Sequence, residues 1–347
     1  MSAVKFQQNG ASGIITLNRP EALNALTLSM VRAMFPQLVA WADDSNIDHV
    51  IIEGAGDKGF CAGGDIRALH DWGQAGAPQA RDFYREEYRL NRLIKTYPKP
   101  YIALMDGITM GGGVGVSVHG CHRVATQRTR FAMPETGIGL LPDVGGTYFL
   151  PRLAGALGAY LVLTGAQLQA ADCCYAGITT HYMQSDQLNA VKTALAGGAA
   201  TAENVAVILE SHHTPPPSAP LIDVQDDINR LFVGANVIDI IDALEGEKTE
   251  WAAAQLARIA SKSPTSCAVA LRQMHDGAMA DFDECLRIEL RAVTRLMQLP
   301  DFYEGVRAII IEKDNAPNWQ PADHAIVKQA DIDAIFKPLG ADELSFD

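Results

Sequence analysis

The amino-acid sequence predicts an α/β fold that is followed by a mainly helical region. In the first 210 residues, short apolar segments typical of strands alternate with longer segments typical of helices. After the polar, proline-rich stretch at residues 211–218, apolar residues recur at helical spacing. We therefore expect a core over residues 1–210 that carries the active site, and a linker with a helical cap over residues 211–347.

The individual elements follow from short local patterns. Thr27 precedes a helical pattern and should cap it, whereas Pro36 should kink that helix or shift its start. The apolar face of this helix consists of Leu28, Val31, Phe35, Leu38 and Trp41. The expected strands cover residues 14–17, 49–53, 101–105, 123–126 and 130–133. Further helices are expected over residues 80–95, 226–231, 237–244, 251–262, 267–277 and 281–299, with a flexible loop over 73–78.

Composition narrows the possible partners. The net charge is −13, which argues against nucleic acid or an anionic membrane surface as the main partner. A small-molecule ligand with phosphates remains compatible, because a local basic patch is enough to bind it. Hydrophobic residues make up 48% and charged residues 20% of the chain, as in a soluble globular protein.

The cysteines and the uncharged segments indicate the compartment. None of the six cysteines forms a C-x-x-C motif, so we expect reduced thiols and a cytoplasmic protein. The N-terminal residues show neither a signal-peptide nor a transit-peptide pattern. Residues 153–171 are uncharged, but their glycines and glutamines favour a buried helix and turn over a membrane span.

Two carboxylates are the strongest candidates for catalysis. Glu135 and Asp143 each follow a proline and stand among apolar and glycine residues. Each proline stiffens the backbone, and apolar surroundings raise the pKa of an acid toward neutrality. The alternative for Asp143 is a structural one, because an acid before Val144 could simply cap the next helix.

Two glycine-rich stretches could supply amide donors. Residues 60–66 follow an expected strand, and residues 107–120 lead from another strand into a helix of small residues. A helix N-terminus exposes N–H groups and favours negative charge. Two such donors aimed at one carbonyl would form an oxyanion hole, which indicates acyl chemistry.

Other signals are weaker. Residues 54–59 have dinucleotide-like glycine spacing, but the required helix and acid do not follow. The stretch around Ser117 lacks the final glycine of a nucleophile-elbow motif, so we expect Ser117 to be a packing residue. Residues 119–122 contain two histidines and a cysteine without a second ligand cluster, so no metal site is expected. Cys61 has no histidine at a spacing that would supply a base.

Three motifs carry a family resemblance. Residues 61–66 (CAGGDI), 111–113 (GGG) and 134–135 (PE) resemble the crotonase (enoyl-CoA hydratase/isomerase) superfamily. Residues 116–120, 131–153, 263–266 and 301–308 are similar to the branch of 3-hydroxyisobutyryl-CoA hydrolases. The resemblance covers residues 14–321. It implies a crotonase-like spiral of ββα units with a C-terminal helical region.

The resemblance also implies roles for single residues. The oxyanion amides correspond to Gly64 and Gly112, the catalytic glutamate to Glu135, and the second acid of the hydrolases to Asp143. Glu135 is expected to act as nucleophile or as general base, and Asp143 to hold the substrate hydroxyl or to protonate the leaving thiolate. The residues expected to contact CoA or the substrate are Ala22, Leu23, Ala62, Gly63, Asp65, Ile66 and Gly111.

The predicted activity is hydrolysis of an acyl-CoA thioester, most similar to that of 3-hydroxyisobutyryl-CoA hydrolase in valine catabolism. CoA is part of the substrate, so no separate cofactor is expected, and a homo-oligomer is possible. An enoyl-CoA hydratase is the alternative, but the position of its second acid is Gly115 here. A non-catalytic acyl-CoA-binding protein is a further alternative. Phe302, Tyr303 and Glu304 resemble a packing motif, and whether they line the acyl pocket stays open.

Overall fold

The computed structural model describes residues 2–197 and 201–346, which form two compact units. Unit 1 comprises the described residues of Met1–Asp65, Glu86–Phe131 and Leu168–Ile222. Unit 2 comprises those of Ile66–Arg85, Ala132–Gln167 and Asp223–Asp347. The boundary expected at residue 210 therefore falls within the last segment of unit 1, and the assignment of a cap over 211–347 stays a prediction.

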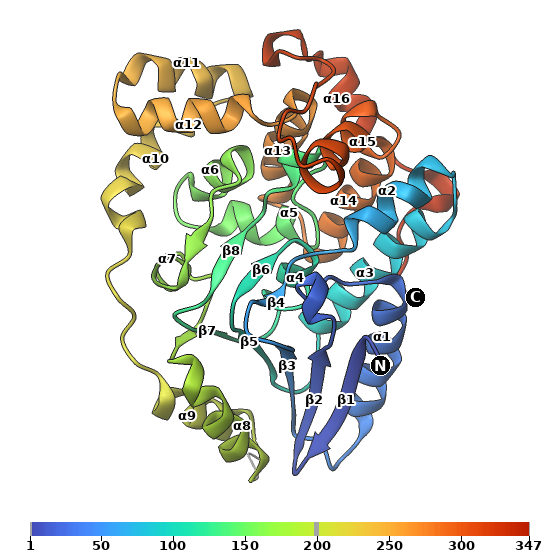
Figure 1. Cartoon of the computed structure of the whole chain (residues 1–347), viewed down its shortest axis with the longest axis vertical. Helices are drawn as coiled ribbons and strands as arrows, with labels where there is room; N and C mark the ends of the chain where they lie inside the picture. The colour runs from blue at the N-terminus through green and yellow to red at the C-terminus, as the bar shows by residue number, and fades with distance from the viewer. Residues whose placement is uncertain (1, 198–200, 347) are drawn as a thin grey trace. The chain divides into compact units, whose positions relative to one another are not determined.

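Within the described residues, the strands form two mixed β-sheets (Figure 1). The larger sheet has the order β1-β2-β3-β5-β7-β10, and the smaller sheet has the order β4-β6-β8-β9. β1 and β2 pair antiparallel, whereas β2, β3, β5, β7 and β10 run parallel. The strands are β1 (Val4–Asn9), β2 (Ser12–Leu17), β3 (His49–Gly54), β4 (Gly59–Cys61), β5 (Tyr101–Met105), β6 (Ile108–Met110), β7 (His122–Ala125), β8 (Arg130–Ala132), β9 (Leu168–Gln169) and β10 (His181–Tyr182).

The chain order repeats a simple pattern. A strand of the larger sheet is followed by a strand of the smaller sheet and then by a helix. This order occurs as β3, β4 and α2 (Ile66–Gln74), as β5, β6 and α4 (Gly112–Gly115), and as β7, β8 and α5 (Gly146–Phe149). It confirms the α/β prediction and the expected ββα order.

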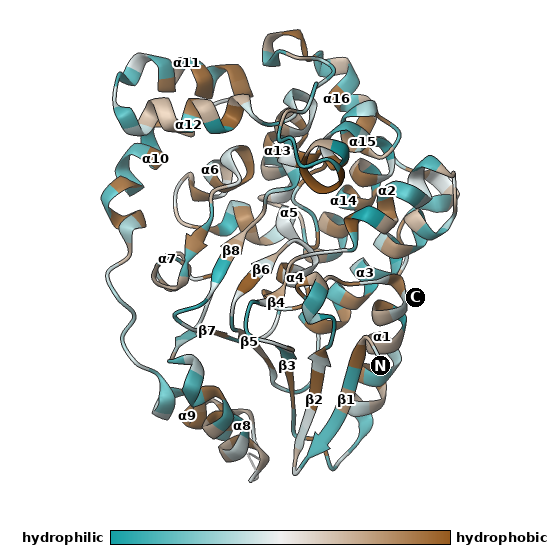
Figure 2. Cartoon of the chain, viewed as in Figure 1, coloured by the Kyte–Doolittle hydropathy of each residue, from teal (hydrophilic) through white to brown (hydrophobic). Residues whose placement is uncertain are grey.

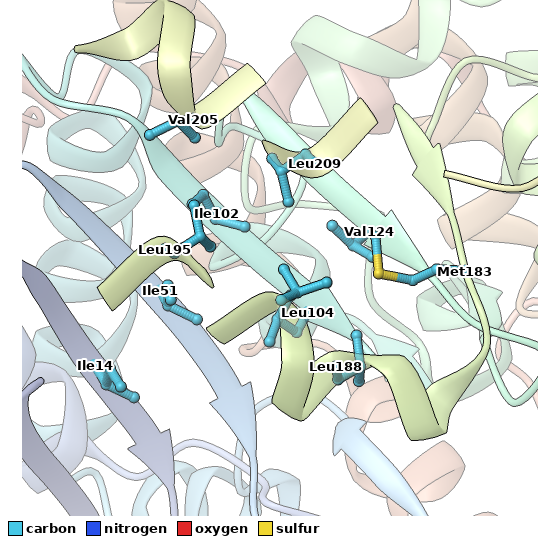
Figure 3. Close-up of a cluster of buried hydrophobic side chains, with 11 residues drawn as sticks. Ile14, Ile51, Ile102, Leu104, Val124, Met183, Leu188, Leu195, Val205 and Leu209 are labelled. Carbon is cyan, nitrogen blue, oxygen red and sulfur yellow. The ribbon is translucent and has the colours of Figure 1, made fainter. Parts of the chain in front are cut away.

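One cluster of the core of unit 1 lies on one face of the larger sheet. All five residues of β5 are buried, as expected for a central parallel strand with an apolar sequence. Figure 3 shows side chains of the sheet pointing toward α8 (Leu188–Ala196) and α9 (Ala202–His212). The cluster consists of Ile14, Ile51, Ile102, Leu104, Val124, Met183, Leu188, Val191, Leu195, Val205 and Leu209.

The first long helix, α1 (Leu28–Asp43), begins where its cap predicts. The Thr27 side chain accepts a hydrogen bond from the amide of Met30 at 3.2 Å. The helix continues through Pro36 and its start is not shifted, so of the two expected effects of this proline only the kink stays a prediction. Phe35 is 37% exposed, because Met30 and Met34 occupy the buried face instead, so its predicted burial is also wrong.

The helical region of unit 2 agrees closely with the pattern of the sequence. The predicted helices appear as α10 (Gln225–Leu231), α11 (Val237–Glu247), α12 (Glu250–Ala260), α13 (Pro264–Gly277) and α14 (Phe282–Leu296).

Residues 213–219 form neither helix nor strand, and Figure 2 shows this connector in pale and hydrophilic colours. The other helices are α3 (Gln79–Lys95), α6 (Leu157–Thr164), α7 (Ala170–Tyr175), α15 (Pro300–Val306) and α16 (Gln329–Ile335).

Two further predictions concern single segments. The loop expected over residues 73–78 begins only after Gln74, where α2 ends. Residues 153–171 include the buried helix α6, as expected. Among the described residues, no helix combines the length and the apolar character that crossing a membrane requires.

Candidate active site

Two glycine amides lie close together in unit 1. Gly112 is the first residue of α4, and Gly64 follows β4 in the loop before α2. A Cβ atom built on Gly112 would lie 3.3 Å from the amide nitrogen of Gly64. Among the described residues, neither amide donates a hydrogen bond to another protein atom. The two predicted oxyanion donors are therefore neighbours.

Backbone pairing explains the direction of the Gly64 amide. Leu26 donates to the carbonyl of Gly63 at 2.8 Å and accepts from the amide of Asp65 at 2.8 Å. This parallel bridge uses the residues on both sides of Gly64, so the amide of Gly64 itself points away from Leu26. Gly63 (φ 118°) and Gly111 (φ 47°) adopt backbone conformations that favour glycine, which accounts for the glycine beside each donor.

A carboxylate that the sequence analysis missed lies at the same position. Glu87 on α3 is only 2% exposed, and its Oε1 would be 2.5 Å from a Cβ atom on Gly112. Its position on the mainly apolar, buried face of α3, four residues after Phe83, is the signal that could have identified it. Unit 1 thus combines two amide donors with one buried acid.

The segments around Leu23 and Ala62, both predicted to contact CoA, lie side by side in unit 1. The amide of Ala62 donates to the carbonyl of Leu23 at 3.0 Å. Leu23 (φ 50°) follows the short helix Pro20–Ala22 in a tight turn. The carboxylate of Asp65 forms an ion pair with Arg19 at 3.0 Å, which gives it a structural role as well. The predicted contacts of Ala22, Leu23, Ala62, Gly63, Asp65, Ile66 and Gly111 with CoA stay predictions.

Glu135 lies in unit 2, at the start of a 3-10 helix (Glu135–Ile138) that directly follows Pro134. It is 7% exposed, and its Oε2 has no hydrogen-bond partner among the described residues. Burial first, and then the charge of Asp143, raise the pKa of Glu135 well above its usual range. A buried acid with one unpartnered oxygen is costly to a fold, so its presence favours a functional role.

Asp143 precedes a tight turn rather than acting as the helix cap that was considered for it. The N-cap residue of α5 is Gly145, and the amides of Gly145 and Thr147 donate to the carboxylate of Glu289 at 2.8 and 2.9 Å. Glu289 is on α14 and is fully buried. Burial and the charge of Asp143 raise the pKa of Glu289 to about 8. Unit 2 therefore contains three electrostatically coupled buried acids.

The segment after Leu299 supports the Glu135 helix by packing. A Cβ atom on Gly305 would lie 2.6 Å from the Cα of Ile138, so α15 approaches the 3-10 helix closely. Phe302 is fully buried, and the Tyr303 hydroxyl donates to the carbonyl of Met297 at 2.8 Å. Tyr303 also lines a cavity of about 730 Å³, and Glu304 pairs with Arg307. These contacts agree with a packing motif.

The remaining candidates have ordinary structural roles. Ser117 donates to the carbonyl of Gly113 at 2.7 Å and helps to pack α4. Cys61 is fully buried, and burial raises the pKa of its thiol to about 12, which disfavours a thiolate. Among the described residues, no group of histidine, cysteine or acidic side chains has the arrangement of a metal site.

Comparison with known proteins places these features in a family. Residues 12–336 match the enoyl-CoA hydratase/isomerase family. A mitochondrial 3-hydroxyisobutyryl-CoA hydrolase of Xenopus laevis is 48% identical over 96% of this chain and 89% of its own length. The human protein of the same name is 46% identical over 99% of this chain and 90% of its own length.

Solved structures show the same relationship. The structure of a carnitinyl-CoA dehydratase from Mycobacterium thermoresistibile has a TM-score of 0.94 and is 40% identical, covering 100% of this chain and 99% of its own. That of an enoyl-CoA hydratase from Rhodobacter sphaeroides has a TM-score of 0.93 and is 38% identical, covering 99% of this chain and 100% of its own. The fold is thus the α/β crotonase fold with a C-terminal helical region, and the chain belongs to the enoyl-CoA hydratase/isomerase family.

Proposed function

We propose that this chain is a 3-hydroxyisobutyryl-CoA hydrolase, which cleaves the thioester with water and releases CoA and the free hydroxy acid. The observation that carries this proposal is the identity of 46–48% with hydrolases of that name over nearly the whole chain. The buried acids and the paired amide donors are the groups that thioester hydrolysis requires. The reaction needs no separate cofactor, because CoA belongs to the substrate.

The amides of Gly64 and Gly112 are proposed as the oxyanion hole. When a nucleophile attacks the thioester carbonyl, its oxygen gains negative charge, and preorganised N–H donors stabilise that charge. Their proximity and the lack of protein acceptors for both amides support this role. Loss of one such donor costs about 10²–10³ in kcat.

Glu135 is proposed as the group that acts on the carbonyl. As a nucleophile, its carboxylate forms a mixed anhydride as the thiolate of CoA leaves, and water then cleaves the anhydride. As a general base, it removes a proton from the attacking water. Both mechanisms require the ionised form, so the raised pKa of Glu135 predicts a rate that increases with pH. Hydroxylamine trapping separates them, because only the anhydride leaves a hydroxamate on Glu135.

Asp143 is proposed as the second acid, which holds the substrate hydroxyl or protonates the leaving thiolate. The charge of Asp143 raises the pKa of Glu135, because a negative charge makes ionisation of a nearby acid less favourable. This interaction supports a site that the two acids share. The segments that contain Ala22, Leu23, Gly111 and residues 62–66 are proposed to bind CoA. A homo-oligomer and a cytoplasmic location are also proposed. All six cysteines are unbridged, which supports a reducing compartment, although the relatives named above are mitochondrial.

An enoyl-CoA hydratase is the second candidate, because the two solved structures named above are those of a dehydratase and a hydratase. Gly115 cannot move a proton, which argues against hydration. The buried carboxylate of Glu87 beside Gly112 is, however, a second acid that the sequence analysis did not consider. We therefore prefer the hydrolase because this chain is 46–48% identical to hydrolases over nearly its whole length.

Thiol release from a panel of acyl-CoAs, measured with Ellman's reagent, tests the assignment. We expect CoA release from 3-hydroxyisobutyryl-CoA or 3-hydroxypropionyl-CoA without added metal or nucleotide. Loss of the crotonyl-CoA absorbance without thiol release from either hydroxyacyl-CoA would establish the hydratase instead. Binding of acyl-CoA without either reaction would indicate a non-catalytic binding protein.

A further inference from the structure

The loop that carries Asp143 has an unfavourable backbone conformation. Val144 has a φ of 52° and Gly145 a φ of 87°, so two consecutive residues lie in the left-handed region. A β-branched residue such as valine rarely adopts this conformation, which costs on the order of 1–3 kcal/mol in free energy. Surrounding contacts must therefore hold this loop in place.

Two fully buried side chains provide these contacts. Glu289 on α14 accepts from the amides of Gly145 and Thr147, one to each carboxylate oxygen. Gln273 on α13 donates to the carbonyl of Pro142 and to the hydroxyl of Thr147. Together the two side chains hold backbone groups on both sides of Asp143. We refer to Glu289 and Gln273 as the loop clamp.

Stability alone is a poor explanation for an acid at this position. Asp143 acts electrostatically on Glu289, so the fold contains two neighbouring acids in a buried environment. Burying acids together is costly, and a neutral acceptor would satisfy N–H groups without this repulsion. A carboxyl group, however, presents one oxygen to each of two amides with a fixed geometry, which defines the position of the residues between its partners.

We propose that Glu289 is a positioning residue that acts through Asp143, with Gln273 as the second half of the loop clamp. This inference rests on the proposed catalytic role of Asp143. Glu289 does not contact the reacting atoms in this proposal. It fixes the turn at Val144 and Gly145 so that the carboxylate of Asp143 has one orientation. A small displacement of a catalytic group, of about 1 Å, is enough to cost about 10²-fold in rate.

A double-mutant cycle tests this proposal. Glu289→Gln keeps the size of the side chain but replaces one acceptor oxygen by a donor, so one of the two amides loses its partner. In the parent protein, we expect kcat to fall by about 10²-fold with a nearly unchanged KM. In the Asp143→Asn background, the same change should lower kcat by less than about threefold, because the group that it positions is already disabled.

Each result has a defined meaning. Equal fold-losses of kcat in both backgrounds, or full activity of Glu289→Gln beside a slow Asp143→Asn, would overturn the positioning role alone. Full activity of Asp143→Asn would overturn the proposed role of Asp143, and the positioning role with it. Gln255→Ala is the matched control, because Gln255 is a buried polar residue on α12 whose Nε2 donates to the carbonyl of Trp251 in the same helix. We expect it to keep the parental kcat. If Glu289→Gln does not fold, Gln273→Met is measured in the same two backgrounds and must show the same dependence on Asp143.

Discussion

The substitution Gly112→Ala gives the most direct test of the proposed oxyanion hole. The φ angle of Gly112 is outside the left-handed region, so alanine fits the backbone. The new methyl group, however, would lie close to the carboxylate of Glu87 and to the amide of Gly64. It would lie 2.5 Å from Oε1 of Glu87, 3.1 Å from Leu26 and 3.3 Å from the amide nitrogen of Gly64.

These distances set the expected magnitude. An ordinary carbon–oxygen contact is about 3.3 Å, so the methyl group and Glu87 would overlap by about 0.8 Å. Glu87 is 2% exposed, and we expect α4 to shift by a similar distance as the methyl group is accommodated. A shift of that size removes Gly112 from its position as a donor, and kcat/KM should fall by about 10²–10³, or about 3–4 kcal/mol in transition-state stabilisation.

CoA release measured with Ellman's reagent follows this loss, and circular dichroism and the melting temperature verify the fold. Gly246→Ala is the matched control, because a Cβ atom on Gly246 meets no atom within 4 Å. Gly246 lies within α11, so its replacement should keep kcat/KM and raise stability by up to about 1 kcal/mol. A folded Gly112→Ala protein with a kcat/KM within threefold of the parent would refute the reasoning from this geometry. If Gly112→Pro, which removes the amide hydrogen, were equally active, the donor itself would be refuted.

Three further predictions concern the acids of unit 2. Glu135→Gln should lower kcat by about 10²–10⁴ and should abolish the increase of rate with pH that its raised pKa predicts; parental turnover of this variant would contradict the whole site. Asp143→Asn should keep the fold and the affinity for CoA while kcat falls, and isothermal titration beside steady-state kinetics separates these effects; unchanged kcat would leave Asp143 without a catalytic role. The pKa of Glu289 is raised from 4.5 to about 8 in the folded protein. Between these two pH values, Glu289 keeps its proton in the folded protein but has lost it in the unfolded chain. The contribution of Glu289 to the free energy of unfolding therefore decreases as the pH rises. The free energy of unfolding of the parent relative to Glu289→Gln should therefore decrease from pH 5 to pH 8, by up to about 1.4 kcal/mol per pH unit, and a constant difference in chemical denaturation would contradict this.

The sequence predicted best where the determining interactions are local. The side chain of Thr27 caps its own helix, and the apolar run at β5 forms a buried strand, because both patterns depend on neighbouring residues. The place of Gly112 at a helix N-terminus was also predictable, since helix N-termini have local signatures, whereas the oxyanion role of Gly64 and Gly112 stays a proposal. Phe35 was assigned to the wrong face because neighbouring residues on α1 compete for burial, and only the packed structure decides between them.

Interactions between distant parts of the sequence were not predictable. Glu289 holds the amides of Gly145 and Thr147 although it lies more than 140 residues further along the chain. Its place on the buried, apolar stripe of α14 marks it as unusual, but the sequence does not indicate which distant amides it binds. Glu87 lies in a charged segment of α3, where an acid is usually solvated. For the same reason, Asp143 was considered as a helix cap, a function that Glu289 fulfils instead.

The composition of unit 2 has a consequence for engineering. This unit joins the segment that contains Glu135 and Asp143 with the helices after Ile222, and contacts such as those of Glu289 and Gly305 connect the two. A chimera that exchanges only the C-terminal region between relatives would separate the loop from its clamp. A functional exchange should instead transplant residues 66–85, 132–167 and 223–347 together, so that the recombination points follow the compact unit rather than the linear sequence.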